Sequence, residues 1–122
     1  MDIYSPCALG ATINDTTINQ LKCSVIAGAA NNQLMDEKLH GEILFQKGIV
    51  YAPDYLINAG GVMNCYAEIH DISDAKVMEM AGNIYQTTTD ILKSSRNENI
   101  PTSLAANRLA EKRISEESEK LK

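Results

Sequence analysis

The spacing of hydrophobic residues predicts three short strands in the first half of the chain. Residues 2–5 form a strand candidate that Pro6 ends, and residues 24–30 are a continuous apolar run. Such a run is typical of a parallel strand that is buried on both faces. Residues 49–51 predict a third strand, which stops before Pro53.

Helical patterns lie between these strands. Residues 13–17 offer caps for a short helix that presents Ile18 and Leu21, and Asp36 begins a second helix that ends at Gly48. One face of the second helix carries Leu39, Ile43 and Leu44. Strands that alternate with helices through short connections predict the α/β class with a parallel sheet. Three strands make only half of a usual sheet.

The second half of the chain is helical in pattern. One helix is predicted from Gly61 to about Ile69, and a longer one from a Ser73 cap through Ser94. The apolar stripe of the longer helix is Val77, Met80, Ala81, Ile84, Thr88, Ile91 and Leu92. After Pro101, Thr102 or Ser103 caps a last helix. Its narrow apolar seam is Ala105, Ala106, Leu109, Ala110 and Ile114, and its charged tail is expected to fray.

Composition and charge limit the classes of function. With 44% hydrophobic and 22% charged residues among 122, the chain has the profile of one globular unit. We expect a sheet-containing part, residues 1–69, with a helical segment, residues 70–122, packed on it. The net charge of -5 disfavours binding to nucleic acid or to anionic lipid. No apolar run approaches the ~20 residues of a membrane helix.

The first residues and the cysteines indicate a reducing compartment. The start lacks the basic and apolar regions of a secretory signal, so we expect a cytoplasmic protein. Cys7, Cys23 and Cys65 are widely spaced, which predicts buried, inert thiols rather than disulfides or a metal site. His40 and His70 have no second ligand at helical spacing and are interpreted as packed or surface residues.

Candidate chemistry lies after the strands, because ligands of open parallel sheets bind beyond the carboxyl ends of strands. The amides of Asn31, Asn32 and Asn58 both donate and accept hydrogen bonds, as a carboxamide and ribose hydroxyls require. The competing interpretation is that Asn31 and Asn32 only cap a turn. Gly60 and Gly61 either let the backbone approach a ligand or form a plain tight turn. We expect Cys7, Asn31 and Asn58 to gather around one hollow.

Several common motifs are missing from the sequence. No G-x-G-x-x-G loop follows a strand, so neither a pyrophosphate nor an adenine ribose has its usual site. No Ser/His/Asp or Cys/His set indicates nucleophilic catalysis.

Four blocks resemble leucine dehydrogenases of the Glu/Leu/Phe/Val amino-acid dehydrogenase family, in the same order and spacing. They are residues 2–11, 25–34, 48–62 and 100–111. The resemblance implies the second half of a Rossmann-like nucleotide-binding domain. It also implies NAD as cofactor and oxidative deamination of an L-amino acid to a 2-oxo acid and ammonia.

The same resemblance assigns supporting roles to particular residues. Those that match the cofactor side are Cys7, Ala8, Asn31, Asn32 and Asn58. Those that match the substrate side are Asn58, Val62 and Cys65. The run Cys-Tyr-Ala-Glu at residues 65–68 stands where the family has Val-Ala-Asp-Glu, which affects the substrate side chain that would fit.

The resemblance places the catalytic lysines, the catalytic aspartate and the glycine-rich loop outside this chain. We therefore expect a carboxy-terminal fragment without turnover of its own, with Met1 as an internal start, a truncated gene model or a split gene. Its partners would be the amino-acid substrate and the missing amino-terminal domain or further copies. The alternatives are a non-catalytic interaction or regulatory fragment that recruits a partner at the free edge of the first strand, and a remnant without a role.

Overall fold

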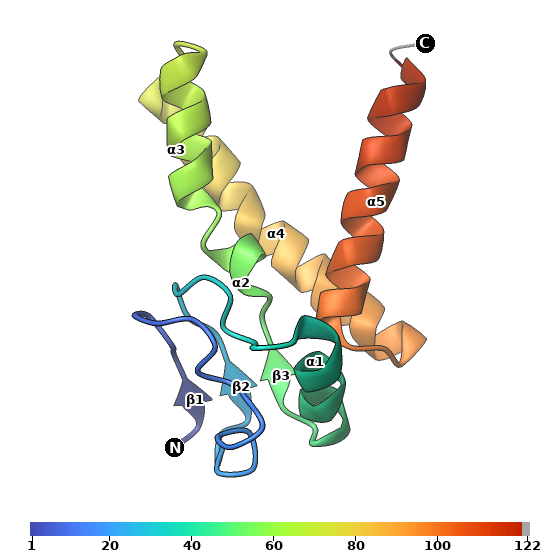
Figure 1. Ribbon diagram of the computed structural model, residues 1–122. Helices are drawn as coiled ribbons and strands as arrows, with labels where there is room; N and C mark the ends of the chain where they lie inside the picture. Colours follow the sequence, from blue (N-terminus) through green and yellow to red (C-terminus); the bar gives the residue numbers. More distant parts are fainter. Residues whose placement is uncertain (121–122) are drawn as a thin grey trace.

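A small parallel sheet forms the base of the molecule. The computed structural model describes residues 1–120 and has the strands β1 (Ile3–Tyr4), β2 (Val25–Ile26) and β3 (Val50–Tyr51). All pairs are parallel and the order is β1-β2-β3 (Figure 1). Together with the helices around it, this sheet confirms the predicted α/β class.

The register of the strands divides their side chains into two faces. Tyr4, Ile26 and Tyr51 lie on one face and pack with the buried Ile13, Ile18, Leu34 and Leu44. Ile3, Val25 and Val50 lie on the other face, where Ile3 is 59% and Val50 39% exposed. The prediction that residues 24–30 are buried on both faces is therefore wrong, because the core covers one face only.

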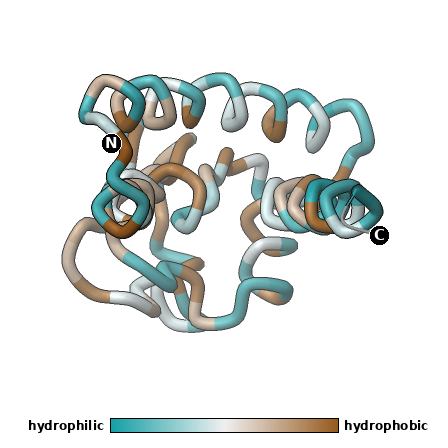
Figure 2. Tube along the Cα trace, turned by 90° about the horizontal axis from the view of Figure 1, so that it is seen from above, coloured by the Kyte–Doolittle hydropathy of each residue, from teal (hydrophilic) through white to brown (hydrophobic). Residues whose placement is uncertain are grey.

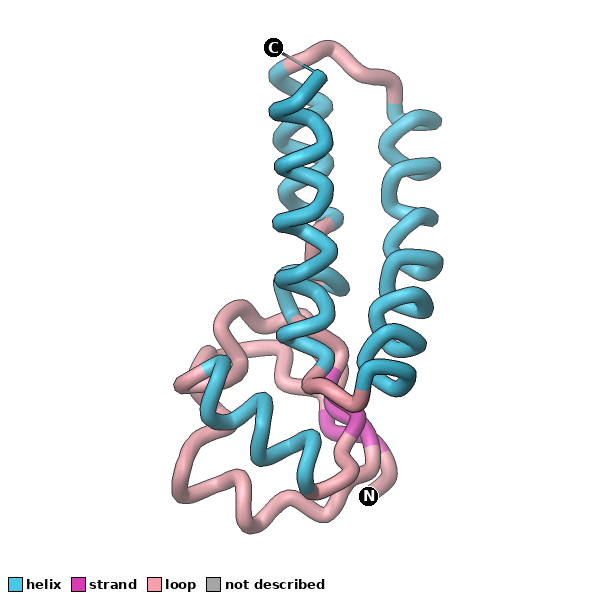
Figure 3. The backbone as a smooth tube through the Cα atoms, turned by 90° about the vertical axis from the view of Figure 1, so that its right-hand side faces the viewer, coloured by secondary structure: helices cyan, strands magenta, loops and turns pink. Residues whose placement is uncertain are grey.

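Helix α1 (Glu37–Gln46) follows β2 as predicted. The Asp36 side chain caps it by accepting a hydrogen bond of 2.8 Å from the backbone N–H of Leu39. Gly48 ends the helix at φ +70, a conformation that favours glycine. Leu44 is fully buried in the core, whereas Leu39 remains 50% exposed. In Figure 3, α1 lies to one side of the strands.

The short helix predicted between β1 and β2 is absent, and turns take its place. The Asn14 Oδ1 atom accepts from the backbone N–H groups of Thr16 and Thr17, and the Thr17 hydroxyl donates to the Thr12 carbonyl at 2.6 Å. Short polar side chains that bond nearby backbone compete with a helical ladder, which explains the outcome. Ile18 still reaches the core.

Four helices follow β3. They are α2 (Asp54–Ile57), α3 (Gly60–Ile69), α4 (Asp74–Glu98) and α5 (Thr102–Lys120). The short α2 was not predicted, whereas α3, α4 and α5 match the predicted helices. Figure 2 shows the molecule from above, where α4 runs along one side. The turns of α4 that face away from the rest of the molecule are mostly hydrophilic. Helix α4 ends at Glu98, four residues beyond Ser94, and the left-handed Asn99 follows as its C-cap.

A second, smaller core joins the helices to each other. Ile91 of α4 packs with Ala105 and Ala106 of α5, next to Leu56 and Leu109. The apolar seam predicted for α5 holds only in its first half, because Ala110 is exposed and Ile114 is 70% exposed where α4 and α5 diverge (Figure 1).

The end of α5 differs from the prediction. Its tail is helical to Lys120 instead of frayed, with charge pairs between Lys112 and Glu116 and between Glu117 and Lys120. Residues 121–122 of the predicted frayed tail lie outside the described residues.

Candidate functional site

The loops after β1 and β2 touch at Gly28. Ala27 N–H donates to the Tyr4 carbonyl at 3.1 Å, and Ala30 N–H donates to the Pro6 carbonyl at 3.0 Å, so the pairing continues beyond the strands. A Cβ atom on Gly28 would lie 2.1 Å from the Pro6 carbonyl oxygen. Only glycine fits this position, and its lack of a side chain lets the two strand ends meet.

Cys7 lies in this contact region and is exposed. The backbone N–H of Ala29 and, secondarily, the Ser5 hydroxyl, 3.3 Å from the thiol sulfur, lower the pKa of the Cys7 thiol. The prediction of buried, inert thiols holds for Cys23 and is wrong for Cys7 and Cys65, which are both exposed. Burial of a cysteine depends on which neighbouring segment covers it, and that is not readable from the local sequence.

Asn58, at the end of α2, reaches back to the loop after β2. Its Nδ2 atom donates to the Ala29 carbonyl at 3.3 Å and to Asn31 Oδ1. Cys7, Asn31 and Asn58 therefore meet around Ala29, from the loops after β1 and β2 and from the end of α2. Ala8 follows Cys7 on the same exposed loop.

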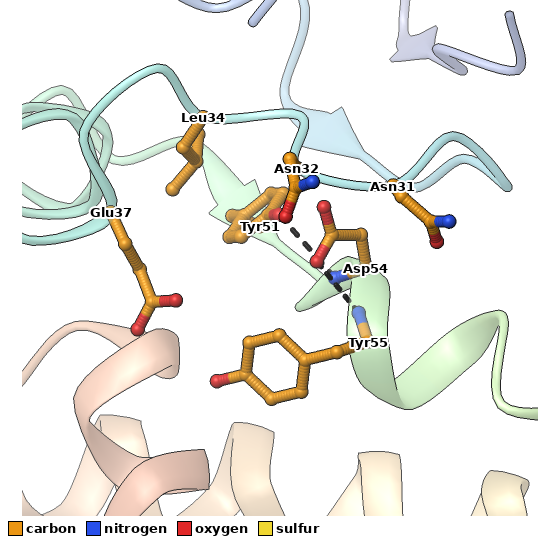
Figure 4. Close-up of a pocket in the computed structure, with 7 residues that line it drawn as sticks. All are labelled: Asn31, Asn32, Leu34, Glu37, Tyr51, Asp54 and Tyr55. Atoms are coloured by element: carbon orange, nitrogen blue, oxygen red, sulfur yellow. Dashed lines mark hydrogen bonds between the residues drawn. The ribbon is translucent and has the colours of Figure 1, made fainter. Parts of the chain in front are cut away.

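Asn32 points in a different direction from Asn31. It has a left-handed backbone (φ 51), and its carbonyl accepts a 2.7 Å bond from Ala11 N–H, which joins the loop after β2 to the loop after β1. Figure 4 shows its side chain beside Tyr51 and Asp54, while the Asn31 side chain points away from them. The side chains of the two asparagines thus point in different directions, although both residues border the same cavity (Figure 4).

The loop that carries Asn31 and Asn32 borders a polar cavity of 320 Å³. Its lining residues are Asn31, Asn32, Leu34, Glu37, Tyr51, Asp54 and Tyr55 (Figure 4). Burial raises the pKa of Tyr51, and the nearby Asp54 charge adds to this effect. Burial also raises the pKa of Tyr55, with contributions from Glu37 and Asp54. Both phenols therefore stay protonated at neutral pH and can donate hydrogen bonds.

Two buried polar residues behind the strand ends lie in segments that the sequence selected, but sequence reasoning gave them no role. Gln33 is 0% and Asp54 6% exposed. The backbone N–H of Gln33 donates to Asp54 Oδ2 at 2.7 Å, and the Gln33 side-chain amide donates to the carbonyls of Gly28 and Ala30. Their position directly after apolar strands was the available signal, because polar residues that end buried strands often bond backbone groups.

Val62 and Cys65 lie on α3. They are three residues apart and therefore share a helix face, and both are exposed, Val62 to 75%. Gly60 and Gly61 begin α3, and a Cβ atom on either would meet nothing within 4 Å. Of the predicted substrate-side residues, Val62 and Cys65 thus share an exposed face of α3, whereas Asn58 lies with Asn31.

His40 and His70 occupy the surroundings that were predicted for them. His40 is 2% exposed, and its Nε2 atom lies 3.0 Å from Asp15 Oδ1. His70 is exposed beside the Tyr66 ring. No group of three or more potential metal ligands occurs within residues 1–120.

Comparison with known proteins gives this geometry a context. The model of the Glutamate/Leucine/Phenylalanine/Valine dehydrogenase family matches residues 1–121. The chain belongs to this family. The resemblance seen in four sequence blocks is therefore confirmed.

Individual members of the family are similar over nearly the whole chain. Leucine dehydrogenase of Bacillus cereus is 52% identical over 93% of this chain, which is 31% of that protein. Leucine dehydrogenase of Bacillus subtilis is 54% identical over the same shares. The crystal structure of L-tryptophan dehydrogenase from Nostoc punctiforme superposes with a TM-score of 0.92 at 46% identity, covering 98% of this chain and 35% of that one.

The chain thus spans about a third of the length of the family members that it matches. Within residues 1–120, no helix is both long enough and apolar enough to cross a membrane.

Proposed function

We propose that this chain is part of an NAD-dependent L-amino-acid dehydrogenase of the leucine type, which oxidatively deaminates its substrate to a 2-oxo acid and ammonia. Residues 1–69 would form the nucleotide-binding part, with residues 70–122 packed on it. The observation that carries the proposal is the contact of Asn31 and Asn58 around Ala29, at the ends of adjacent parallel strands.

The residues around Ala29 fit the nicotinamide nucleoside half of the cofactor. Asn31 and Ala29 are exposed, and the side chains of Asn31 and Asn58 are uncharged hydrogen-bonding amides. Neither brings a charge that would oppose the positive charge of the oxidised nicotinamide ring. When bound, the ring accepts a hydride from the substrate. Asn31 and Asn58 would orient the ring and the ribose. Cys7 and Ala8 would line the cofactor from the loop after β1, and Asn32 would border it from the loop after β2.

The substrate side of the proposal rests on α3. Val62 and Cys65 present a small apolar surface that suits the side chain of an aliphatic amino acid. Relatives carry the names leucine, phenylalanine and L-tryptophan dehydrogenase. Leucine is proposed because the sequence blocks most resemble leucine dehydrogenases, and comparison of leucine, valine and phenylalanine as substrates of the assembled enzyme tests it.

We propose that the chain by itself has no turnover, because the resemblance places the catalytic lysines and the catalytic aspartate of the family outside this chain. The test incubates the purified chain with leucine and NAD and follows NADH fluorescence, with a leucine dehydrogenase as positive control. The expected result is no NADH above background. Leucine-dependent NADH formation by the chain alone would contradict the assignment of the catalytic groups to another segment.

Binding is tested separately with nicotinamide mononucleotide (NMN), which carries the proposed half of the cofactor. NMR titration should shift the side-chain amide signals of Asn31 and Asn58, whereas adenosine monophosphate should shift them little. Asn58→Ala should weaken the binding because it removes the Nδ2 donor without adding a charge, and Asn83→Ala on the exposed surface of α4 is the matched control. Equal responses to both nucleotides would refute a nicotinamide site.

A second candidate function is a non-catalytic module that assembles with a partner chain. Ile3 on the edge strand β1 and Val50 on the same sheet face are exposed to 59% and 39%, which favours a covering partner. Co-purification with an amino-terminal segment of a leucine dehydrogenase tests it. A chain that stays monomeric in the presence of that segment would contradict the proposal that a partner chain covers this face.

The proposed compartment is the cytoplasm. Cys7 and Cys65 are exposed free thiols, and such thiols persist in reducing compartments.

A further inference from the structure

Gln33 and Asp54 bracket the loop that carries Asn31. Before Asn31, the Gln33 Nε2 atom donates to the Gly28 carbonyl at 2.6 Å and to the Ala30 carbonyl at 2.9 Å. After Asn31, the Gln33 backbone N–H donates to Asp54 Oδ2 at 2.7 Å. The backbone before Asn31 is thereby tied to the Gln33 side chain and the backbone after Asn31 to the Asp54 side chain, both of which are buried.

Asp54 in turn ties this loop to α2, which leads to Asn58. Its Oδ1 atom accepts a 2.6 Å bond from Tyr55 N–H in the first turn of the helix, and Asn58 stands at the end of the same helix. The Asp54 carboxylate is therefore shared between the segment before Asn58 and the segment after Asn31. No lysine or arginine of residues 1–120 forms an ion pair with it.

The chemistry of both side chains matches these bonds. A carboxylate can accept from two N–H groups at once, whereas an asparagine amide offers only one acceptor atom. The Gln33 amide must turn Nε2 toward Gly28 and Ala30, because its oxygen would face two carbonyl acceptors there. Gln33 Oε1 is buried without a partner within the described residues, so the side chain contributes through its donated bonds.

We infer that Gln33 and Asp54 are positioning residues, whose buried hydrogen bonds hold the loop of residues 28–33 against the start of α2 and so keep the amide of Asn31 on that of Asn58. The consequence for cofactor binding rests on the proposed function. The contact between the two asparagines does not rest on it and can be measured alone.

The test compares Asp54→Asn with Asp90→Asn, an equally small change on the exposed surface of α4. In D54N, either Gln33 N–H or Tyr55 N–H loses its acceptor, so the loop can move away from α2. NMR should show loss of the nuclear Overhauser contact between the side-chain amides of Asn58 and Asn31 in D54N and its retention in D90N. A folded D54N chain that keeps this contact would overturn the positioning role.

Binding of NMN provides the functional measurement. We expect its dissociation constant to rise about tenfold in D54N, as for loss of one well-placed hydrogen bond, and to stay unchanged in D90N. A purely structural role would lower the melting temperature and leave the affinity of the folded fraction unchanged, which would also overturn the inference. If the unmodified chain does not bind NMN, the proposed function fails, and the contact measurement still decides the positioning role.

Hydrogen exchange in the unmodified chain keeps the inference testable if D54N does not fold. The Gln33 backbone N–H should exchange as slowly as the Ala27 N–H of the β1–β2 pairing, although it lies in a loop. Protection of this amide supports the bond to Asp54. Exchange at the rate of an unstructured amide would overturn it.

Discussion

At the scale of single residues, the strand ends depend on Gly28. The Pro6 backbone occupies the space where any other residue would place its Cβ atom, and Ala30 N–H bonds the same Pro6 carbonyl. Ala29, the neighbour of Gly28, then serves as the contact point for Cys7 and Asn58. A residue without a side chain thus determines where the candidate site forms.

Gly28→Ala should destabilise the chain by about 3 kcal/mol or more, because a backbone segment must move to admit the methyl group. Gly61→Ala is the control, since its Cβ atom would meet nothing within 4 Å and alanine favours the helix by up to about 1 kcal/mol. Urea unfolding measures both free energies. A Gly28→Ala chain as stable as the parent would mean that the loops can separate at little cost.

Cys7 should react with iodoacetamide at lower pH than an ordinary cysteine. Its lowered pKa means that the reactive thiolate is already present below the usual range, and loss of the Ser5 hydroxyl in Ser5→Ala should move the reaction profile to higher pH. The shift should be partial because Ala29 N–H makes the larger contribution. Mass spectrometry of alkylated peptides over a pH series measures it, with buried Cys23 as the internal control. An identical profile in both chains would contradict the role of Ser5.

At the scale of elements, α5 is attached to the sheet and to its neighbouring segments through its first two turns. The Thr102 hydroxyl donates to the Tyr51 carbonyl at 2.6 Å, and Asn107 bridges the Tyr55 hydroxyl to Glu37 of α1. Arg108 also pairs with Glu98 at the end of α4, and beyond this part α5 diverges from α4 (Figure 1), so the attachment depends on the first half of α5.

Thr102→Val should lower the free energy of unfolding by about 1–3 kcal/mol, because it leaves the Tyr51 carbonyl without its donor at nearly unchanged side-chain volume. Thr89→Val is the matched control, since the Thr89 hydroxyl bonds the Tyr85 carbonyl within α4 on the exposed surface. We expect the control to change stability by less than about 0.5 kcal/mol. Urea unfolding measures both changes. Equal effects would show that the bond from Thr102 to β3 stabilises the fold no more than the bond of Thr89 within α4.

At the scale of the whole molecule, the sheet has one covered and one open face. The core and α1 lie against Tyr4, Ile26 and Tyr51, while Ile3 and Val50 face outward on the other side. Parallel sheets are usually covered on both faces, so this arrangement leaves apolar surface available for association.

The double substitution Ile3→Lys with Val50→Lys should keep the fold and reduce association. Both side chains are substantially exposed, so the cost in stability should be small, whereas two charges oppose burial of this face against another chain. Sedimentation velocity over a concentration series measures association, and Ile114→Lys on the 70% exposed end of α5 is the control. Unchanged association in the double variant would exclude the open face as the contact.

The sequence by itself determined the features that depend on neighbouring residues. Hydrophobic spacing located the three strands, the Asp36 cap and Gly48 bounded α1, and the apolar stripe of α4 lies on its covered side. The order of strands and helices was sufficient for a parallel sheet, and the sequence blocks were sufficient for the family. These features follow from local backbone preferences and from which side chains avoid water, so a linear pattern carries them.

Only the tertiary structure decided which residues meet and which surfaces stay open. The bond of Asn58 to Asn31 spans 27 positions, and that of Gln33 to Asp54 spans 21. Contacts between distant segments likewise decide three other features. These are the turn at residues 13–17, the exposure of Cys7 and the open sheet face. Such contacts are set by the summed packing of distant segments, and a local pattern allows several outcomes with similar energies.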